Sequence, residues 1–90
     1  MQFSELEFKK CPDYMIAGLQ ALHTFPNGYT ASVLYGGKAY TTNGTYEMAV
    51  LDKDMELDYS TPITEGGVLA YQTKEEIQQA LYAIEALPQK

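Results

Sequence analysis

The stretch from Thr73 to Pro88 constrains the fold more than any other part of the sequence, because it encodes a capped amphipathic helix. Thr73 and Glu76 have the spacing of a capping box, in which each side chain accepts a hydrogen bond from the other residue's backbone N–H. Apolar residues then recur at steps of three and four until Pro88 ends the pattern: Ile77, Ala80, Leu81, Ile84 and Leu87. Burying the large side chains contributes about 6–12 kcal/mol before entropy is subtracted, so this helix needs a surface to cover.

The preceding sequence predicts an antiparallel sheet as that surface. The turn FPNGY carries an Asn-Gly pair, which supplies the positive φ values of tight turns, and strand-like runs at 17–25 and 29–35 flank it as a hairpin. Residues 13–22 also fit one face of a helix, so strand and helix both stay open there. Residues 45–52 alternate in polarity as a half-buried strand does.

A turn at residues 52–55 then sends the chain back as a fourth strand over residues 56–59, and glycine is the residue expected near Met55. The sequence therefore predicts an α+β fold, a small antiparallel β-meander of about four strands with one C-terminal helix packed on one face. We expect a single domain spanning 1–90. It would hold an N-terminal segment (1–16), the β-meander (17–63) and the helix (73–87).

Composition limits the chemistry that this chain can carry. Cys11 and His23 are the only residues of their types, so neither an internal disulfide nor a Cys/His zinc site is available. We expect no metal, no cofactor and no enzymatic activity; a Cys11–His23 nucleophile pair would depend on folding to bring the two together. The chain has no run of apolar residues long enough for a signal peptide or a membrane span, which favours the cytoplasm of a host cell.

Charge is distributed unevenly along the chain. Residues 1–45 contain three lysines and three acidic residues, whereas residues 46–90 contain three lysines and nine acidic residues, so the net charge of −6 lies in the second half. Six lysines without arginine cannot form a basic face for phosphates, and we expect no direct binding to nucleic acid. An acidic protein is suited instead to a partner protein with a basic surface.

Acidic residues recur at every second position of the predicted hairpin: Asp52, Asp54, Glu56 and Asp58. A calcium loop beginning at Asp52 would need glycine at position 57 and glutamate at position 63, where the chain has leucine and isoleucine. Two hypotheses remain for this stretch. It is either a solvated hairpin tip or an acidic contact ladder, in which Glu56 and Asp58 share a strand face with their carboxylates about 6.7 Å apart.

The stretch YGGKAYTTNGTY at 35–46 is rich in glycine and tyrosine and is predicted to form a loop. No helix and no GK[ST] motif follows its glycines, so a phosphate cradle is the weaker alternative. Tyrosine is a frequent anchor of protein interfaces, and the chain has eight. We therefore add three residues of this loop to the four acids as candidate partner-binding residues: Tyr35, Lys38 and Tyr40.

The order of several motifs resembles a family of small proteins encoded by tailed phages and prophages. The motifs are NGYTASV (27–33), YGG (35–37), GTYEMAVLDKD (44–54), LDYSTPIT (57–64) and IEAL (84–87). The similarity covers about residues 17–87, and none of these motifs is catalytic. This chain departs from the family pattern at Met55, where glycine is usual, and at Gly66-Gly67, where acids are usual. The resemblance implies a phage accessory protein.

The favoured hypothesis is a stoichiometric inhibitor that docks on a host defence or nucleic-acid-handling protein, in the manner of anti-CRISPR proteins. The acids would meet a basic groove while the loop tyrosines supply anchors. One alternative is an oligomeric binder of small molecules, such as a sponge for a nucleotide signal that uses the glycine-rich loop and Lys38. Others are a phage accessory interaction module and, least favoured, an enzyme. Open strand edges would also allow a homodimer.

Overall fold

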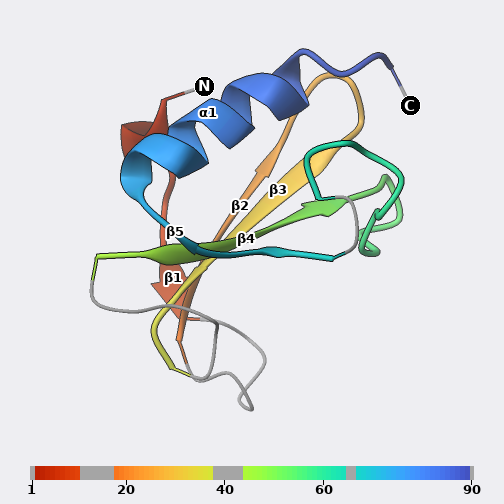
Figure 1. The fold of residues 1–90 in the computed structure, drawn as a ribbon. Helices are drawn as coiled ribbons and strands as arrows, with labels where there is room; N and C mark the ends of the chain where they lie inside the picture. The colour runs from red at the N-terminus through yellow and green to blue at the C-terminus, as the bar shows by residue number, and fades with distance from the viewer. Residues whose placement is uncertain (1, 11–17, 38–43, 65–66, 90) are drawn as a thin grey trace.

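The computed structural model describes residues 2–10, 18–37, 44–64 and 67–89, and its elements form two layers (Figure 1). They are η1 (Phe3–Glu5), β1 (Lys9–Lys10), β2 (Leu19–Thr24), β3 (Thr30–Tyr35), β4 (Tyr46–Leu51), β5 (Leu69–Gln72) and α1 (Lys74–Glu85). The strands form one antiparallel sheet in the order β1-β2-β3-β4-β5, and α1 crosses one of its faces. The predicted α+β fold with a C-terminal helix is confirmed, with one strand more than expected.

The hairpin predicted around FPNGY is confirmed as β2 and β3. The two strands pair from Leu19 opposite Tyr35 to Thr24 opposite Thr30. The turn closes with hydrogen bonds from Phe25 N to Tyr29 O and from Gly28 N to Phe25 O, and Gly28 has a φ of 93°. Residues 19–22 are therefore strand, whereas 13–17 lie outside the described residues.

The core lies between α1 and the face of the sheet that α1 covers. Every second residue of the long strands points into it. Buried apolar side chains come from β2, β3, β4 and α1 and from the turn between β2 and β3: Ala21, Phe25, Tyr29, Ala31, Val33, Met48, Val50, Ile77, Ala80, Leu81 and Ile84. The capping box is formed as predicted, with hydrogen bonds from Glu76 N to Thr73 Oγ1 (3.2 Å) and from Thr73 N to Glu76 Oε1 (2.9 Å). The periodicity of the helix thus identified its buried face correctly.

The predicted return strand at 56–59 is wrong. Only one isolated bridge forms there, between Leu51 and Leu57. The strand that pairs with β4 on the side away from β3 is β5, which comes after the loop that follows residue 59. The pairing contains a bulge, because Tyr46 lies opposite Gln72 and Met48 opposite Leu69, so that one β4 residue faces two β5 residues. A bulge breaks strict alternation, which is why the sequence of β5 gave no clear strand signal.

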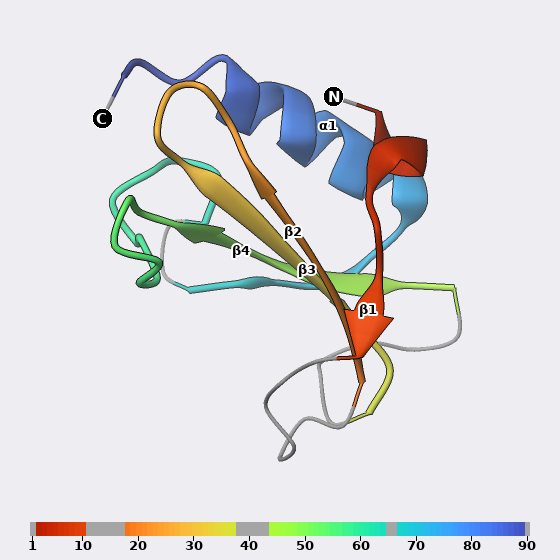
Figure 2. The same ribbon diagram turned by 180° about the vertical axis from the view of Figure 1, so that it is seen from behind.

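Residues 2–8, here called the N-terminal strap, lead from α1 to the edge of the sheet (Figure 2). Its start is tied to the helix by hydrogen bonds from Phe3 N to Gln78 Oε1 (2.6 Å) and from Gln2 Nε2 to the Tyr82 hydroxyl (2.8 Å). Phe3 and Phe8 also pack around Tyr46 of β4. The strap therefore joins the two layers at the end of the molecule where α1 begins.

Candidate functional site

Residues 52–59, here called the acidic loop, follow β4 and project from the side of the sheet opposite β1 (Figure 1). The Asp52 carboxylate organises the loop by accepting hydrogen bonds from Asp54 N (2.8 Å) and Glu56 N (3.1 Å). Backbone hydrogen bonds from Asp52 N to Glu56 O and from Met55 N to Asp52 O close the same turn. The loop therefore has a defined shape, and one of its four acids is used to hold that shape.

Met55 occupies the left-handed backbone region with a φ of 63°, at the place where glycine was expected. A residue with a β-carbon is strained in this region by about 1–2 kcal/mol. The turn thus has the conformation that the sequence predicts, with a residue that fits it poorly. Its side chain is 49% exposed, so the strain does not serve to bury methionine.

Asp58 does not lie on an exposed ladder with Glu56, so one of the two hypotheses for this stretch, the acidic contact ladder, is wrong. It is only 7% exposed, and it accepts hydrogen bonds from the backbone N–H (2.8 Å) and the hydroxyl of Ser60. The Thr64 hydroxyl donates to the backbone carbonyl of Asp58 (3.1 Å). Asp58 therefore anchors the base of the acidic loop, because the chain turns inward there instead of continuing as a strand.

Two acids and three apolar side chains of the acidic loop are left at the surface. Asp54 and Glu56 are exposed, and they alternate with Met55 (49% exposed), Leu57 (46%) and Tyr59 (54%). The sequence alternation that suggested a strand instead describes a loop surface on which carboxylates and large apolar groups are interleaved.

Tyr35 lies at the other end of the sheet from the acidic loop. Thr30 pairs with Leu51, and Tyr35 is five residues further along β3, which is about 17 Å in a strand. Its ring is half-buried against Tyr46, with the ring centroids 5.1 Å apart. The structure therefore does not bring Tyr35 together with the acids, and Lys38 and Tyr40 lie outside the described residues.

The turn residue Asn27 has a role that sequence reasoning missed. It is 8% exposed, and its side-chain amide donates hydrogen bonds to the carbonyls of Ile84 (2.8 Å) and Leu87 (3.1 Å) at the end of α1. Its Oδ1 accepts a hydrogen bond from Tyr29 N. Asn is common in turns because of its backbone preference alone. The sequence therefore gave no sign that Asn27 also bonds to the distant end of α1.

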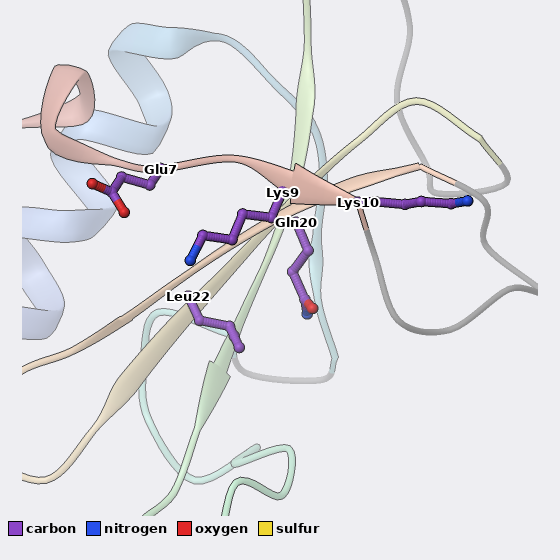
Figure 3. Close-up of a pocket in the computed structure, with 5 residues that line it drawn as sticks. All are labelled: Glu7, Lys9, Lys10, Gln20 and Leu22. Carbon is purple, nitrogen blue, oxygen red and sulfur yellow. The ribbon is translucent and has the colours of Figure 1, made fainter.

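A shallow hollow of about 390 Å³ lies between the N-terminal strap and β2, at the edge opposite the acidic loop (Figure 3). It is lined by Glu7, Lys9, Lys10, Gln20 and Leu22. Figure 3 shows the side chains of Lys9 and Lys10 extending in opposite directions, so their two ammonium groups do not converge on one point. This arrangement does not favour a phosphate-sized anion held by both lysines.

The remaining candidate chemistry has little support in the geometry. His23 packs edge-on against Phe25, with centroids 4.7 Å apart, while Cys11 lies outside the described residues. Within 2–10, 18–37, 44–64 and 67–89, no group of three or more His, Cys, Asp or Glu side chains is arranged to hold a metal ion. Among the same residues, no helix is long and apolar enough to cross a membrane.

Comparison with known proteins gives no relative: no family model, no curated protein and no solved structure matches this chain.

Proposed function

We propose that this protein acts by binding, as a stoichiometric inhibitor of the anti-CRISPR kind, to a host defence or nucleic-acid-handling protein with a basic surface. The observation that carries the proposal is the alternation of exposed acids and exposed apolar side chains on the acidic loop. Interfaces combine large apolar anchors with charges that steer and orient the partner. The loop offers both kinds of group within six consecutive residues, 54–59.

The hydrogen bonds within the acidic loop support the same proposal. Two hydrogen bonds to the Asp52 carboxylate hold the loop from inside, and Asp58 fixes its base. A loop that is already ordered loses less conformational entropy when it binds, so more of the contact energy appears as affinity. The proposed contact residues are accordingly Asp54, Met55, Glu56, Leu57 and Tyr59, whereas Asp52 and Asp58 support them.

The distribution of charge gives this surface a partner class. Two exposed carboxylates, those of Asp54 and Glu56, lie on this surface beside one lysine, Lys53. Carboxylates displayed in this way attract lysine and arginine side chains, and such side chains line the grooves in which other proteins hold nucleic acid. The proposed inhibitor would occupy a groove of that kind and exclude its usual ligand.

The test is a capture experiment with two matched variants in a phage-sensitive host. The tagged protein should retain a basic, nucleic-acid-handling host protein, and Asp54→Lys should reduce that retention at least tenfold. Glu75→Lys changes the net charge by the same amount on α1, away from the acidic loop, and should leave retention within about twofold. Purified wild-type protein should then inhibit the activity of the captured host protein in proportion to its concentration.

Three results would count against the proposal. Equal loss with both variants would show that only the overall charge matters. Retention that does not fall when the salt concentration rises from 50 to 500 mM would remove the electrostatic part. A captured protein whose activity is unchanged by excess wild-type protein would remove the inhibition.

A further inference from the structure

The turn between β2 and β3 carries the pair Asn27-Gly28, a sequence that is chemically reactive. Asn followed by Gly is prone to deamidation, because glycine has no β-carbon to hinder attack by its own backbone nitrogen. In this reaction the Gly28 N–H loses its proton to water, and the nitrogen bonds to Asn27 Cγ. The bond from Cγ to Nδ2 breaks, and ammonia leaves. Water then opens the cyclic imide to aspartate or isoaspartate, so the net change consumes one water and releases one ammonia.

The fold engages the atoms that this reaction must free. Nδ2 of Asn27, the leaving group, donates to the carbonyls of Ile84 (2.8 Å) and Leu87 (3.1 Å) at the end of α1. The attacking nitrogen, that of Gly28, donates to Phe25 O (3.0 Å) in the hydrogen bond that closes the turn. Asn27 is buried, which limits the access of the water that the reaction consumes. The folded turn therefore opposes each step of the deamidation.

The product of the reaction does not fit the place that the amide occupies. A carboxylate at position 27 would put an oxygen where Nδ2 now donates, opposite the carbonyls of Ile84 and Leu87, with no hydrogen to share. These carbonyls lie at the negative end of the helix dipole, and the last turn of α1 contains no basic residue. Isoaspartate would also lengthen the backbone of a tight turn in which Gly28 has a φ of 93°.

We propose that Asn27-Gly28 is a deamidation site that the contact with α1 protects, so that only chains in which the turn has opened are modified. The modification cannot reverse, because the ammonia is lost and the new carboxylate cannot rebuild the contact. The rate in the folded protein then equals the rate in the open chain multiplied by the fraction of molecules that are open, about 10⁻³ or less for an ordinary domain. The site lies outside the acidic loop, so its test does not depend on the proposed partner.

The test follows deamidation of the full chain in native buffer and in concentrated guanidinium chloride at the same pH and temperature. Trypsin cuts after lysine, so Asn27 lies in peptide 11–38, apart from the second Asn-Gly pair of the sequence, Asn43-Gly44, in 39–53. In denaturant, peptide 11–38 should gain the mass that replaces an amide by a carboxyl group. In native buffer this gain should be slower by about 100-fold or more. Asn27→Gln is the control, because its longer side chain forms the imide far more slowly, and its peptide 11–38 should not change.

A variant at the contact tests the source of the protection. Leu87 is partly buried against the core, so Leu87→Ala should loosen the end of α1 and speed the reaction of Asn27 at least threefold in native buffer, but not in denaturant. Equal rates in native buffer and denaturant, no reaction at Asn27 in denaturant, or no faster reaction in Leu87→Ala would each overturn the proposal.

Refolding tests the consequence of the modification. An Asn43→Gln chain that has been deamidated at Asn27 in denaturant should, after return to native buffer, unfold at a lower denaturant concentration than the unreacted chain. Asn27→Asp should shift the midpoint in the same direction, which separates the effect of the carboxylate from that of the isoaspartate backbone. An unchanged midpoint after deamidation would show that the contact can be rebuilt, and would overturn the proposal.

Discussion

Two turns of this protein begin with the same local interaction and end with different roles. In the turn between β2 and β3, Asn27 Oδ1 accepts a hydrogen bond from Tyr29 N, and in the acidic loop an oxygen of Asp52 accepts one from Asp54 N. Both are side-chain-to-backbone bonds over two residues, the pattern that makes Asn and Asp common in turns. The Asn27 side chain is buried against α1, whereas that of Asp52 serves only its own loop.

In each side chain, one oxygen accepts the local hydrogen bond, and the difference in role follows from the other terminal atom, which is nitrogen in Asn27 and oxygen in Asp52. Asn27 has an amide nitrogen, which can donate to carbonyls at the end of a helix, here those of Ile84 and Leu87. The carboxylate of Asp52 has only acceptor atoms, so its further hydrogen bond comes from another N–H of the acidic loop, that of Glu56. The turn between β2 and β3 is therefore packed against the end of α1. The acidic loop is held only by its own hydrogen bonds, and its other side chains stay exposed.

The largest predicted effect is the loss of α1, the helix against which the turn between β2 and β3 packs. Leu81 is fully buried, so Leu81→Asp would place an unpaired carboxylate in the core and cost more than about 4 kcal/mol, close to the whole stability of a small domain. We expect loss of the helical signal in far-UV circular dichroism. The control Ala83→Asp, at an exposed position of the same helix, should keep that signal. A folded Leu81→Asp protein would contradict the placement of α1.

The next effect is specific to the docked turn. Asn27→Ala removes the side-chain donor from two carbonyls at the end of α1, although that of Ile84 keeps a hydrogen bond from Leu87 N. We expect a loss of about 2 kcal/mol in the free energy of unfolding, measured by urea titration. Asn27→Asp keeps the acceptor for Tyr29 N but removes the donor. It should therefore be at least as destabilising as Asn27→Ala. If Asn27→Asp were as stable as the wild type, the contact with α1 would contribute nothing.

The matching change in the acidic loop should cost less, because the loop is in contact with water. Asp52→Ala removes the acceptor of two backbone N–H groups, and we expect a loss of about 1 kcal/mol. Asp52→Asn retains an acceptor oxygen and should recover most of that loss. Equal destabilisation by Asn27→Ala and Asp52→Ala would remove the distinction between the two turns.

The smallest effect concerns Met55. Met55→Gly relieves the positive φ but adds freedom to the unfolded chain, so we expect a net gain of about 0.5 kcal/mol. Met55→Ala shortens the side chain without relieving φ, and it should not stabilise the protein. Both changes remove an exposed apolar group and should weaken the proposed partner contact equally. A gain with alanine as large as that with glycine would show that the side chain, not the backbone, is the source of strain.

The parts of the fold that were predicted correctly depend on residues close together in sequence. The capping box of Thr73 and Glu76, the helical spacing around Leu81 and the turn conformation at Gly28 each involve a few neighbouring residues. The positive φ at Met55 belongs with them. The return strand failed because alternation in residues 55–59 is equally compatible with a loop. The burial of Asp58 could not be predicted, since its burial and its hydroxyl partner depend on where the chain turns next.

The sequence by itself determined the capped helix, the β2–β3 hairpin, the acidic character of the second half and the tight turn at the start of the acidic loop. Only the tertiary structure decided which acids reach the surface, that β5 completes the sheet, that Asn27 closes the end of α1 and that Tyr35 lies far from the acids. The physical reason is the distance along the sequence over which each interaction acts. Propensity, capping and turn geometry are energies of neighbouring residues, whereas burial and distant hydrogen bonds exist only after separate segments have packed together.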